Sequence, residues 1–374
     1  MISNTKILLC SPCQTSKEFI QGGIVIWAKN VLDYYKTQDC SPDIEVVSYD
    51  RKEKKHGSAT FAPLRALSGI TDYIKPVRIT IKKLKSRKYD VMHLCTSASM
   101  SLLKDWIVVK KARKYGARAV VHLHFGRIPE IAEQKNWEWE LLLRIARMAS
   151  DVVTMDMRSY TTLKNIGLNN IHYLPNPLSQ SIIQQIESLK DTTPREKNKV
   201  CFVGHVIPTK GVRELVEACM EVSGIELFVI GKGSPEMKNE MKQLAGDSLS
   251  LYFLDEIDHA EVIREMLSTE IFVLPTYTEG FPNVILESMA CGCAIVTTPV
   301  GAIPEMLALG SEAPCGLCSP PKDVESLRKN IQYFVDNPDE AKVFGQRAAI
   351  RVNEMYAMPI VWKQLVNIWT GKQE

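Results

Sequence analysis

Short apolar runs alternate with amphipathic helical stretches along the first half of the chain. Helical spacing of apolar positions is clearest over Val25–Tyr35, Leu102–Tyr115 and Glu138–Met148. The apolar runs predict strands at 6–10, 44–49, 91–94, 119–124, 152–155 and 171–174. Apolar strands that alternate with helices are typical of a parallel sheet buried on both faces. The first half is therefore predicted to be a doubly wound α/β domain.

The alternation breaks at Pro175-Asn176-Pro177 and restarts after the polar run Lys190–Lys199. The second half predicts strands at 200–204, 225–230, 249–254, 271–275 and 294–297, with helices near 211–222, 235–245, 259–267 and 283–291. We expect a first Rossmann-like domain over 1–177, a linker over 178–198 and a second Rossmann-like domain over 199–354. The apolar helical pattern of 355–374 predicts a C-terminal helix that packs back toward the first domain. Ligands of such sheets bind outside the carboxyl ends of the strands, here facing an interdomain cleft.

Composition adds little that is unusual. A chain of 374 residues with 45% hydrophobic residues is ample for two domains with full cores. The apolar run Ile7–Leu9 is too short for a signal peptide or a membrane span, so we expect a cytoplasmic protein. Cys10/Cys13 and Cys315/Cys318 have the spacing of zinc or redox sites, but the pairs lie in opposite halves. We expect reduced cysteines that pack in the core, and no metal site.

Charge is distributed unevenly along the chain. Residues 1–175 hold 28 Lys and Arg against 16 Asp and Glu, a net charge of +12, and residues 176–374 hold 18 against 27, a net charge of −9. Most of the excess lies in Lys75–Lys88 and Lys104–Arg118. An anionic bilayer attracts such segments by about 1 kcal/mol per basic residue. A membrane surface and an ordinary solvated basic face are both open interpretations, and nucleic acid is the least favoured.

The most informative segment is 276–304, with the sequence TYTEGFPNVILESMACGCAIVTTPVGAIP. A strand ends before it, Gly280 lets backbone approach a ligand, and Pro282 stands where a helix needs no N–H. The free amides of the following helix turn, together with the helix dipole, suit a diphosphate. Glu279 projects from the loop and Glu287 lies about one turn into the helix. One carboxylate can reach the sugar end of a ligand and the other its ribose.

The string EGFPNVILESMACG closely resembles the donor-binding signature of glycosyltransferase family 4, a retaining family with the GT-B fold of two Rossmann-like domains. The resemblance implies a nucleotide-sugar donor, bound by residues of this string. These are Glu279, Gly280, Phe281, Pro282, Asn283, Val284 and Glu287.

Further positions match that family more loosely. The segment FVGHVIPTKG resembles the first strand and loop of its donor domain, which implies that Lys210 binds the diphosphate. Gly22 and Gly23 resemble its N-terminal glycine loop, where backbone lies close to the transferred sugar. His124, in VHLHFGR, matches the histidine that faces the donor sugar, although His122 shares its strand face and the two could exchange roles. The resemblance thus implies His124, Lys210 and Glu279 as the catalytic residues, with the acceptor near Gly23, His124 and Arg127.

Two positions depart from the family pattern. His205 stands where the family usually has an arginine that faces the diphosphate, and Asp255 replaces a glycine near the base-binding loop. A histidine can still donate to a phosphate, although it carries less charge near neutral pH. Gly231-Lys-Gly233 lacks the third glycine of a dinucleotide fingerprint, which argues against a nicotinamide enzyme. No Asp-x-Asp motif occurs, so we expect neither a metal nor another cofactor.

These observations predict a metal-independent retaining glycosyltransferase that uses a UDP- or GDP-sugar. We expect a saccharide or lipid-linked acceptor, work in bacterial surface-polysaccharide or glycolipid synthesis, and a peripheral position on the inner face of the cytoplasmic membrane. The sequence offers no side chain clearly placed as a nucleophile, which favours a front-face displacement in which a phosphate oxygen takes the acceptor proton. Three alternatives stay open: a catalytically silent partner subunit, a GT-B nucleotide-sugar epimerase, and a nucleic-acid-modifying transferase.

Overall fold

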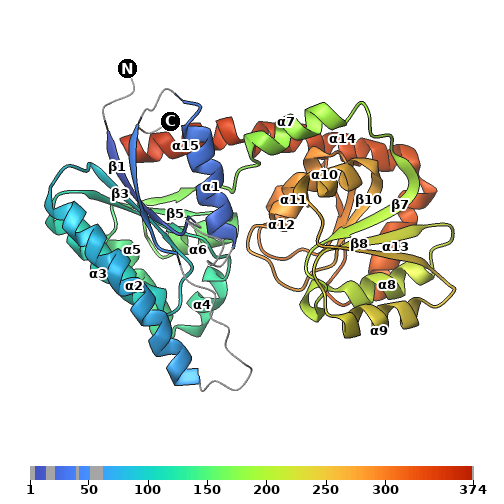
Figure 1. Cartoon of the computed structure of the whole chain (residues 1–374), viewed down its shortest axis with the longest axis horizontal. Coiled ribbons are helices and arrows are strands. Elements are labelled where there is room, and N and C mark those ends of the chain that lie inside the picture. Colours follow the sequence, from blue (N-terminus) through green and yellow to red (C-terminus); the bar gives the residue numbers. More distant parts are fainter. Residues whose placement is uncertain (1–4, 14–21, 39–41, 51–61, 373–374) are drawn as a thin grey trace. The chain divides into compact units, whose positions relative to one another are not determined.

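A computed structural model describes residues 5–13, 22–38, 42–50 and 62–372 of the chain. It divides into two compact units, the first made of residues 1–177 and 361–374 and the second of residues 178–360 (Figure 1). Each unit contains a six-stranded parallel sheet with helices on both faces, as the alternating pattern predicts. The described helices include none that is both long and apolar enough to cross a bilayer.

The first sheet has the strand order β2-β1-β3-β4-β5-β6. Its strands are β1 (Lys6–Ser11), β2 (Asp43–Ser48), β3 (Val91–Thr96), β4 (Arg118–Leu123), β5 (Asp151–Thr154) and β6 (Ile171–Tyr173). The helices of this unit are α1 (Gly23–Tyr35), α2 (Ala62–Lys85), α3 (Ser101–Lys114), α4 (Ile128–Gln134), α5 (Trp137–Met148), α6 (Met157–Asn165) and, from Val361 on, α15 (Met358–Thr370). All six side chains of β3 are buried, as expected for a central strand that helices cover on both faces, and they include the polar residues His93 and Thr96.

The second sheet has the order β12-β11-β10-β7-β8-β9. Its strands are β7 (Glu196–Val203), β8 (Glu226–Ile230), β9 (Ser250–Asp255), β10 (Thr269–Leu274), β11 (Ala294–Thr297) and β12 (Leu317–Cys318). Its helices are α7 (Gln180–Leu189), η1 (Pro208–Lys210), α8 (Val212–Met220), α9 (Pro235–Ala245), α10 (His259–Ser268), α11 (Asn283–Ala290), α12 (Ile303–Met306), α13 (Val324–Asp336) and α14 (Pro338–Met355). With its six strands numbered along the chain, this is the 3-2-1-4-5-6 order of a Rossmann sheet. The strand order reverses between β7 and β10, the first and fourth strands of the sheet.

The expected linker over 178–198 is wrong. Ser179 accepts a hydrogen bond from the Ile182 amide (3.2 Å) and starts α7, and the polar run that follows continues into β7. Lys199 is buried in that strand because its ammonium pairs with Glu196 and Glu265, each at 2.9 Å. The sequence shows the charge of Lys199 but not its ion-pair partners, so this part of the strand resembles a solvated loop.

The C-terminal helix α15 closes the face of the first sheet that α1 also covers. The indole of Trp369 donates to His93 Nδ1 on β3 (2.9 Å), and Trp362 packs against Tyr34 and Tyr35 of α1. The opposite face holds the large apolar cluster beneath α2, α3 and α5. The last segment of the chain thus completes the core of the first unit.

Candidate functional site

Lys210 and Glu279 meet at the point where the strand order of the second sheet reverses. Lys210 ends η1, directly after β7, and Glu279 lies in the loop after β10, the neighbouring strand. The Lys210 ammonium forms an ion pair with the Glu279 carboxylate, and the two side chains are 24% and 14% exposed. A doubly wound sheet binds its ligands at this reversal, outside the carboxyl ends of the strands. Lys210 and Glu279 therefore lie together at the edge of the sheet where a ligand is expected.

Gly211 explains how the two loops come so close. Its φ is +71°, and a Cβ on this residue would lie 2.1 Å from the carbonyl oxygen of Pro275 at the end of β10. The Tyr277 amide also donates to the Thr209 carbonyl (2.9 Å). The loop after β7 is thereby fixed to the loop after β10, which sets the position of Lys210.

A third loop holds the other side of Glu279. Gly301, after β11, has φ +56°, and a Cβ there would lie 2.3 Å from the Glu279 carbonyl oxygen. The Ala302 amide donates to the Gly280 carbonyl at 2.9 Å. Loops from three adjacent strands, β7, β10 and β11, thus enclose the Glu279-Gly280 segment.

Helix α11 begins directly after these loops. Pro282 is its N-cap residue with φ −75°, and no side chain caps the first turn at Asn283 and Val284. Phe281 is buried and packs edge-on against Tyr356, with 5.8 Å between the ring centroids. The helix dipole and the Lys210 charge together make this corner suited to an anion.

Glu287 lies one turn into α11 and is largely buried. Its carboxylate lies 3.2 Å from Nε2 of His259, the first residue of α10. The sequence analysis missed His259, although it follows β9, whose carboxyl end lies on the same edge of the sheet. Glu287 and His259 form a polar pair on the side of α11 toward α10.

The two departures from the family pattern have different surroundings. His205 is exposed in the loop between β7 and η1, the short helix that ends at Lys210. Asp255 has φ +56°, a conformation that glycine adopts readily, and its carboxylate pairs with Lys238 of α9. The backbone at Asp255 therefore keeps the shape that a glycine would have there.

In the first unit, His124 lies beneath α1, next to the aromatic side chains of His122 and Trp27. Its ring centroid is 3.8 Å from that of His122 and 5.0 Å from that of Trp27. Burial lowers the pKa of His124 to about 3, with the nearby His93 as a smaller cause, and the pKa of His122 falls well below its usual range for the same reason. His124 is therefore neutral, and its buried Nε2 has no hydrogen-bond partner in the described structure.

His122 faces the same side of the sheet and belongs to a second grouping. His93, Cys95 and His122 are buried and have potential metal-ligand atoms within 4.8 Å of one another, the sole group of this kind among the described residues. Neither C-x-x-C pair belongs to this group. Burial raises the pKa of the Cys13 thiol to about 12, and it raises the pKa of the Cys318 thiol to about 12 as well.

The remaining expected residues also lie in the first unit. Gly22 is the N-cap of α1, and a Cβ on Gly22 or Gly23 would meet no atom within 4 Å. The guanidinium of Arg127 donates to Ser99 Oγ (2.8 Å) and pairs with Glu138. Arg127 is thus fixed beside the loop after β3, at the carboxyl edge of the sheet.

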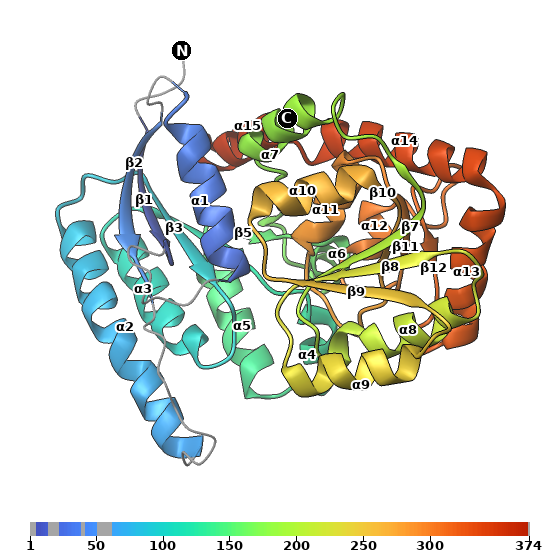
Figure 2. The same cartoon turned by 45° about the vertical axis from the view of Figure 1, so that its right-hand side comes forward.

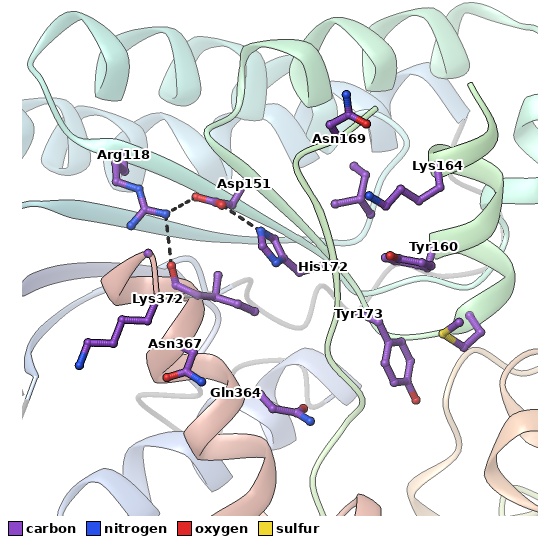
Figure 3. Close-up of a pocket in the computed structure, with 14 residues that line it drawn as sticks. Arg118, Asp151, Tyr160, Lys164, Asn169, His172, Tyr173, Gln364, Asn367 and Lys372 are labelled. Atoms are coloured by element: carbon purple, nitrogen blue, oxygen red, sulfur yellow. Dashed lines mark hydrogen bonds and ion pairs between the residues drawn. The ribbon is translucent and has the colours of Figure 1, made fainter. Parts of the chain in front are cut away.

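The first unit also has a pocket of about 640 Å³, which opens at the amino ends of β4 and β5, opposite to the carboxyl edge of the same sheet (Figure 3). Asp151 accepts hydrogen bonds from Arg118 (2.6 Å) and His172 (2.9 Å). Arg118 also donates to the Trp369 carbonyl (3.0 Å). Gln364, Asn367 and Lys372 of the C-terminal segment line the same pocket. This network fastens the end of α15 to the sheet.

Residues 184–351 match the sequence model of a family described as glycosyl transferases group 1. An uncharacterized glycosyltransferase of Methanocaldococcus jannaschii is 28% identical over 49% of this chain and 48% of that protein. Alpha-maltose-1-phosphate synthase of Mycolicibacterium smegmatis is 26% identical over 76% of this chain and 74% of its own length. The chain thus spans about half the length of the archaeal relative and three quarters of the mycobacterial one.

Solved structures with the same fold cover nearly the whole chain. Sucrose-phosphate synthase from Thermosynechococcus elongatus has a TM-score of 0.74 at 17% identity, with 98% of each chain covered. Anabaena HepE in complex with UDP has a TM-score of 0.70 at 15% identity, covering 98% of this chain and all of that one. The expected GT-B fold is confirmed.

Proposed function

Since residues 184–351 match the sequence model of the glycosyl transferases group 1 family and the chain has the GT-B fold, we propose that the protein transfers a sugar from a UDP- or GDP-sugar to an acceptor. The second unit binds the donor and the first unit binds the acceptor. The observation that carries this proposal is the Lys210–Glu279 pair beside the start of α11, where a diphosphate would receive a cation and helix amides.

The proposed roles follow from the surroundings of each residue. Lys210, His205 and the amides of Asn283 and Val284 stabilise the charge that develops on the leaving diphosphate. Glu279 accepts hydrogen bonds from hydroxyls of the sugar, and Glu287 accepts hydrogen bonds from hydroxyls of the ribose. His124, neutral because it is buried, acts as a hydrogen-bonding group toward the sugar and not as a general acid.

Transfer proceeds with retention of the anomeric configuration and without a metal. A phosphate oxygen takes the acceptor proton on the face from which the diphosphate leaves, and preorganised charges lower the barrier. Lys210 supplies the positive charge that this route requires at the diphosphate. The acceptor is a saccharide or a lipid-linked saccharide near Arg127, in surface-polysaccharide or glycolipid synthesis. The protein works peripherally, on an anionic membrane surface.

The proposal is tested by thermal unfolding with a panel of nucleoside diphosphates and their sugars. A ligand present at 100 times its dissociation constant raises the free energy of unfolding by about 2.7 kcal/mol. A Lys210→Ala variant should lose this stabilisation, and Lys342→Ala, a change on α14, should keep it. Failure of every UDP and GDP compound to stabilise the protein would contradict the proposal. Proton NMR of the product then determines the anomeric configuration, and turnover in EDTA determines metal dependence.

A further inference from the structure

The outward face of α3 carries large apolar side chains in place of polar ones. Met100, Leu103, Trp106 and Ile107 follow one another at helical spacing, and each is between 38% and 46% exposed. We refer to these four residues as the α3 ridge. Scattered apolar side chains are normal on a surface, but a contiguous row of this size marks a place where something binds.

The surroundings of the α3 ridge are basic. Lys110, Arg113 and Lys114 continue the same face of α3 and are exposed, and the Lys110 ammonium lies 5.4 Å from the centre of the Trp106 ring. Helix α2 lies beside α3 in both views (Figures 1 and 2). The helix α2 adds the exposed basic residues Lys75, Arg78, Lys82 and Lys85.

No exposed carboxylate lies among the described side chains of α2 and α3. Over 72–85 and 101–114, the described side chains of the two helices, the acidic residues are Asp72, which is half-buried, and Asp105, which is fully buried. Other basic residues of the same segments do not contribute. Lys104 is turned inward against Asp105, and Lys83 pairs with Glu45.

We propose that the α3 ridge inserts into the interfacial region of an anionic bilayer. A tryptophan among aliphatic side chains fits the depth of the lipid headgroups, and flanking Lys and Arg meet anionic phosphates. A nucleic acid would use the basic residues and leave the apolar ridge uncovered. A second copy of the chain would bring the two basic rims against each other, which is unfavourable.

The position of the α3 ridge links membrane binding to the acceptor. Helix α3 begins at the carboxyl edge of the sheet, and Ser99, next to Met100, accepts a hydrogen bond from Arg127. Insertion of the ridge places Arg127 at the level of the headgroups. The inference rests on the proposed function in this respect, and it names the acceptor as a saccharide carried by a membrane lipid.

The test is cosedimentation of the full chain with vesicles of phosphatidylcholine alone or mixed equally with phosphatidylglycerol. The wild type should bind the mixed vesicles and bind the neutral ones at least about tenfold more weakly. Leu103→Ser with Ile107→Ser should lower partitioning into the mixed vesicles about tenfold or more. The matched control Ile350→Ser, at a position 59% exposed on α14, should change it less than about twofold.

Three outcomes would overturn the inference. These are no binding of the wild type to mixed vesicles, full binding of the double variant, and a wild-type dimer in sedimentation velocity that the double variant loses. Nucleotide binding measured on the same proteins without vesicles separates the two proposals. The double variant should bind nucleotide like the wild type, whereas failure of the wild type to bind any nucleotide would count against the proposed function alone.

Discussion

Replacement of Gly211 by alanine should both destabilise the second unit and weaken nucleotide binding. The residue has φ +71°, where an alanine costs about 1–2 kcal/mol of backbone strain. The added Cβ would also lie 2.1 Å from the Pro275 carbonyl oxygen, which is backbone and cannot rotate away. Such overpacking costs a further 1–3 kcal/mol or so. The expected loss in the free energy of unfolding is therefore about 2–5 kcal/mol.

Gly310 provides a matched control in the same unit. Its φ is +81°, but a Cβ there would meet no atom within 4 Å, so Gly310→Ala should cost the backbone strain alone. Denaturant unfolding measures both losses. The clash in Gly211→Ala can be relieved only if the η1 loop moves away from β10, which separates Lys210 from Glu279. Calorimetry with the cognate nucleotide should therefore show weaker binding for Gly211→Ala and unchanged binding for Gly310→Ala. Equal stability and equal affinity for the two variants would refute the argument that this contact positions Lys210.

Three further outcomes are expected. Glu287→Ala should abolish calorimetrically measurable nucleotide binding with the fold intact, as judged by circular dichroism, and unchanged affinity would contradict its ribose role. His205→Ala should slow turnover at saturating nucleotide-sugar by about 100-fold or more, because it removes one preorganised hydrogen-bond donor to the developing anion. His205→Arg should keep the turnover, because arginine can still donate. The free energy of unfolding should fall in acid. The folded pKa values of His93 and His124, both about 3, lie below the unfolded value near 6.5. Each neutral histidine therefore makes its full contribution to stability above pH 6.5, and this contribution declines as the pH falls below that value. Denaturant unfolding at pH 5.5 should show a loss of about 1.4 kcal/mol per histidine, and a His124→Phe variant that loses as much as the wild type would contradict the argument.

The sequence predicted the two sheets well because their strands are buried on both faces. Every predicted strand is present, and each boundary is within a few residues. The prediction failed at 178–198, where polarity alone did not distinguish a linker from a capped helix and a strand with an internally paired lysine. Local pattern carries no information on such long-range partners, since Glu265 lies 66 positions away from Lys199.

The candidate site was predicted only in part, because some of its contacts also join positions that are far apart in the chain. The string around Gly280 identified the loop and helix α11, and spacing placed Glu287 one turn into that helix. His259 was missed because its pairing with Glu287 joins elements 28 positions apart. The position of Lys210 against Glu279 depends on the contact of Gly211 with the Pro275 carbonyl, directly after β10, which no pattern in either segment could reveal.

The ion pair between Lys210 and Glu279 has a consequence for how a donor enters. Both side chains are mostly buried, and an unpaired charge in such a place is costly, so each stabilises the other when no ligand is present. A diphosphate carries more negative charge than one carboxylate and is the stronger partner for the lysine. Once Lys210 turns to the diphosphate, Glu279 must find other donors, and the hydroxyls of the attached sugar lie next to that diphosphate. A nucleoside diphosphate without its sugar leaves Glu279 without this replacement. The nucleotide-sugar should therefore bind more tightly than the bare nucleotide, and Glu279→Gln, which needs no countercharge, should reduce that difference.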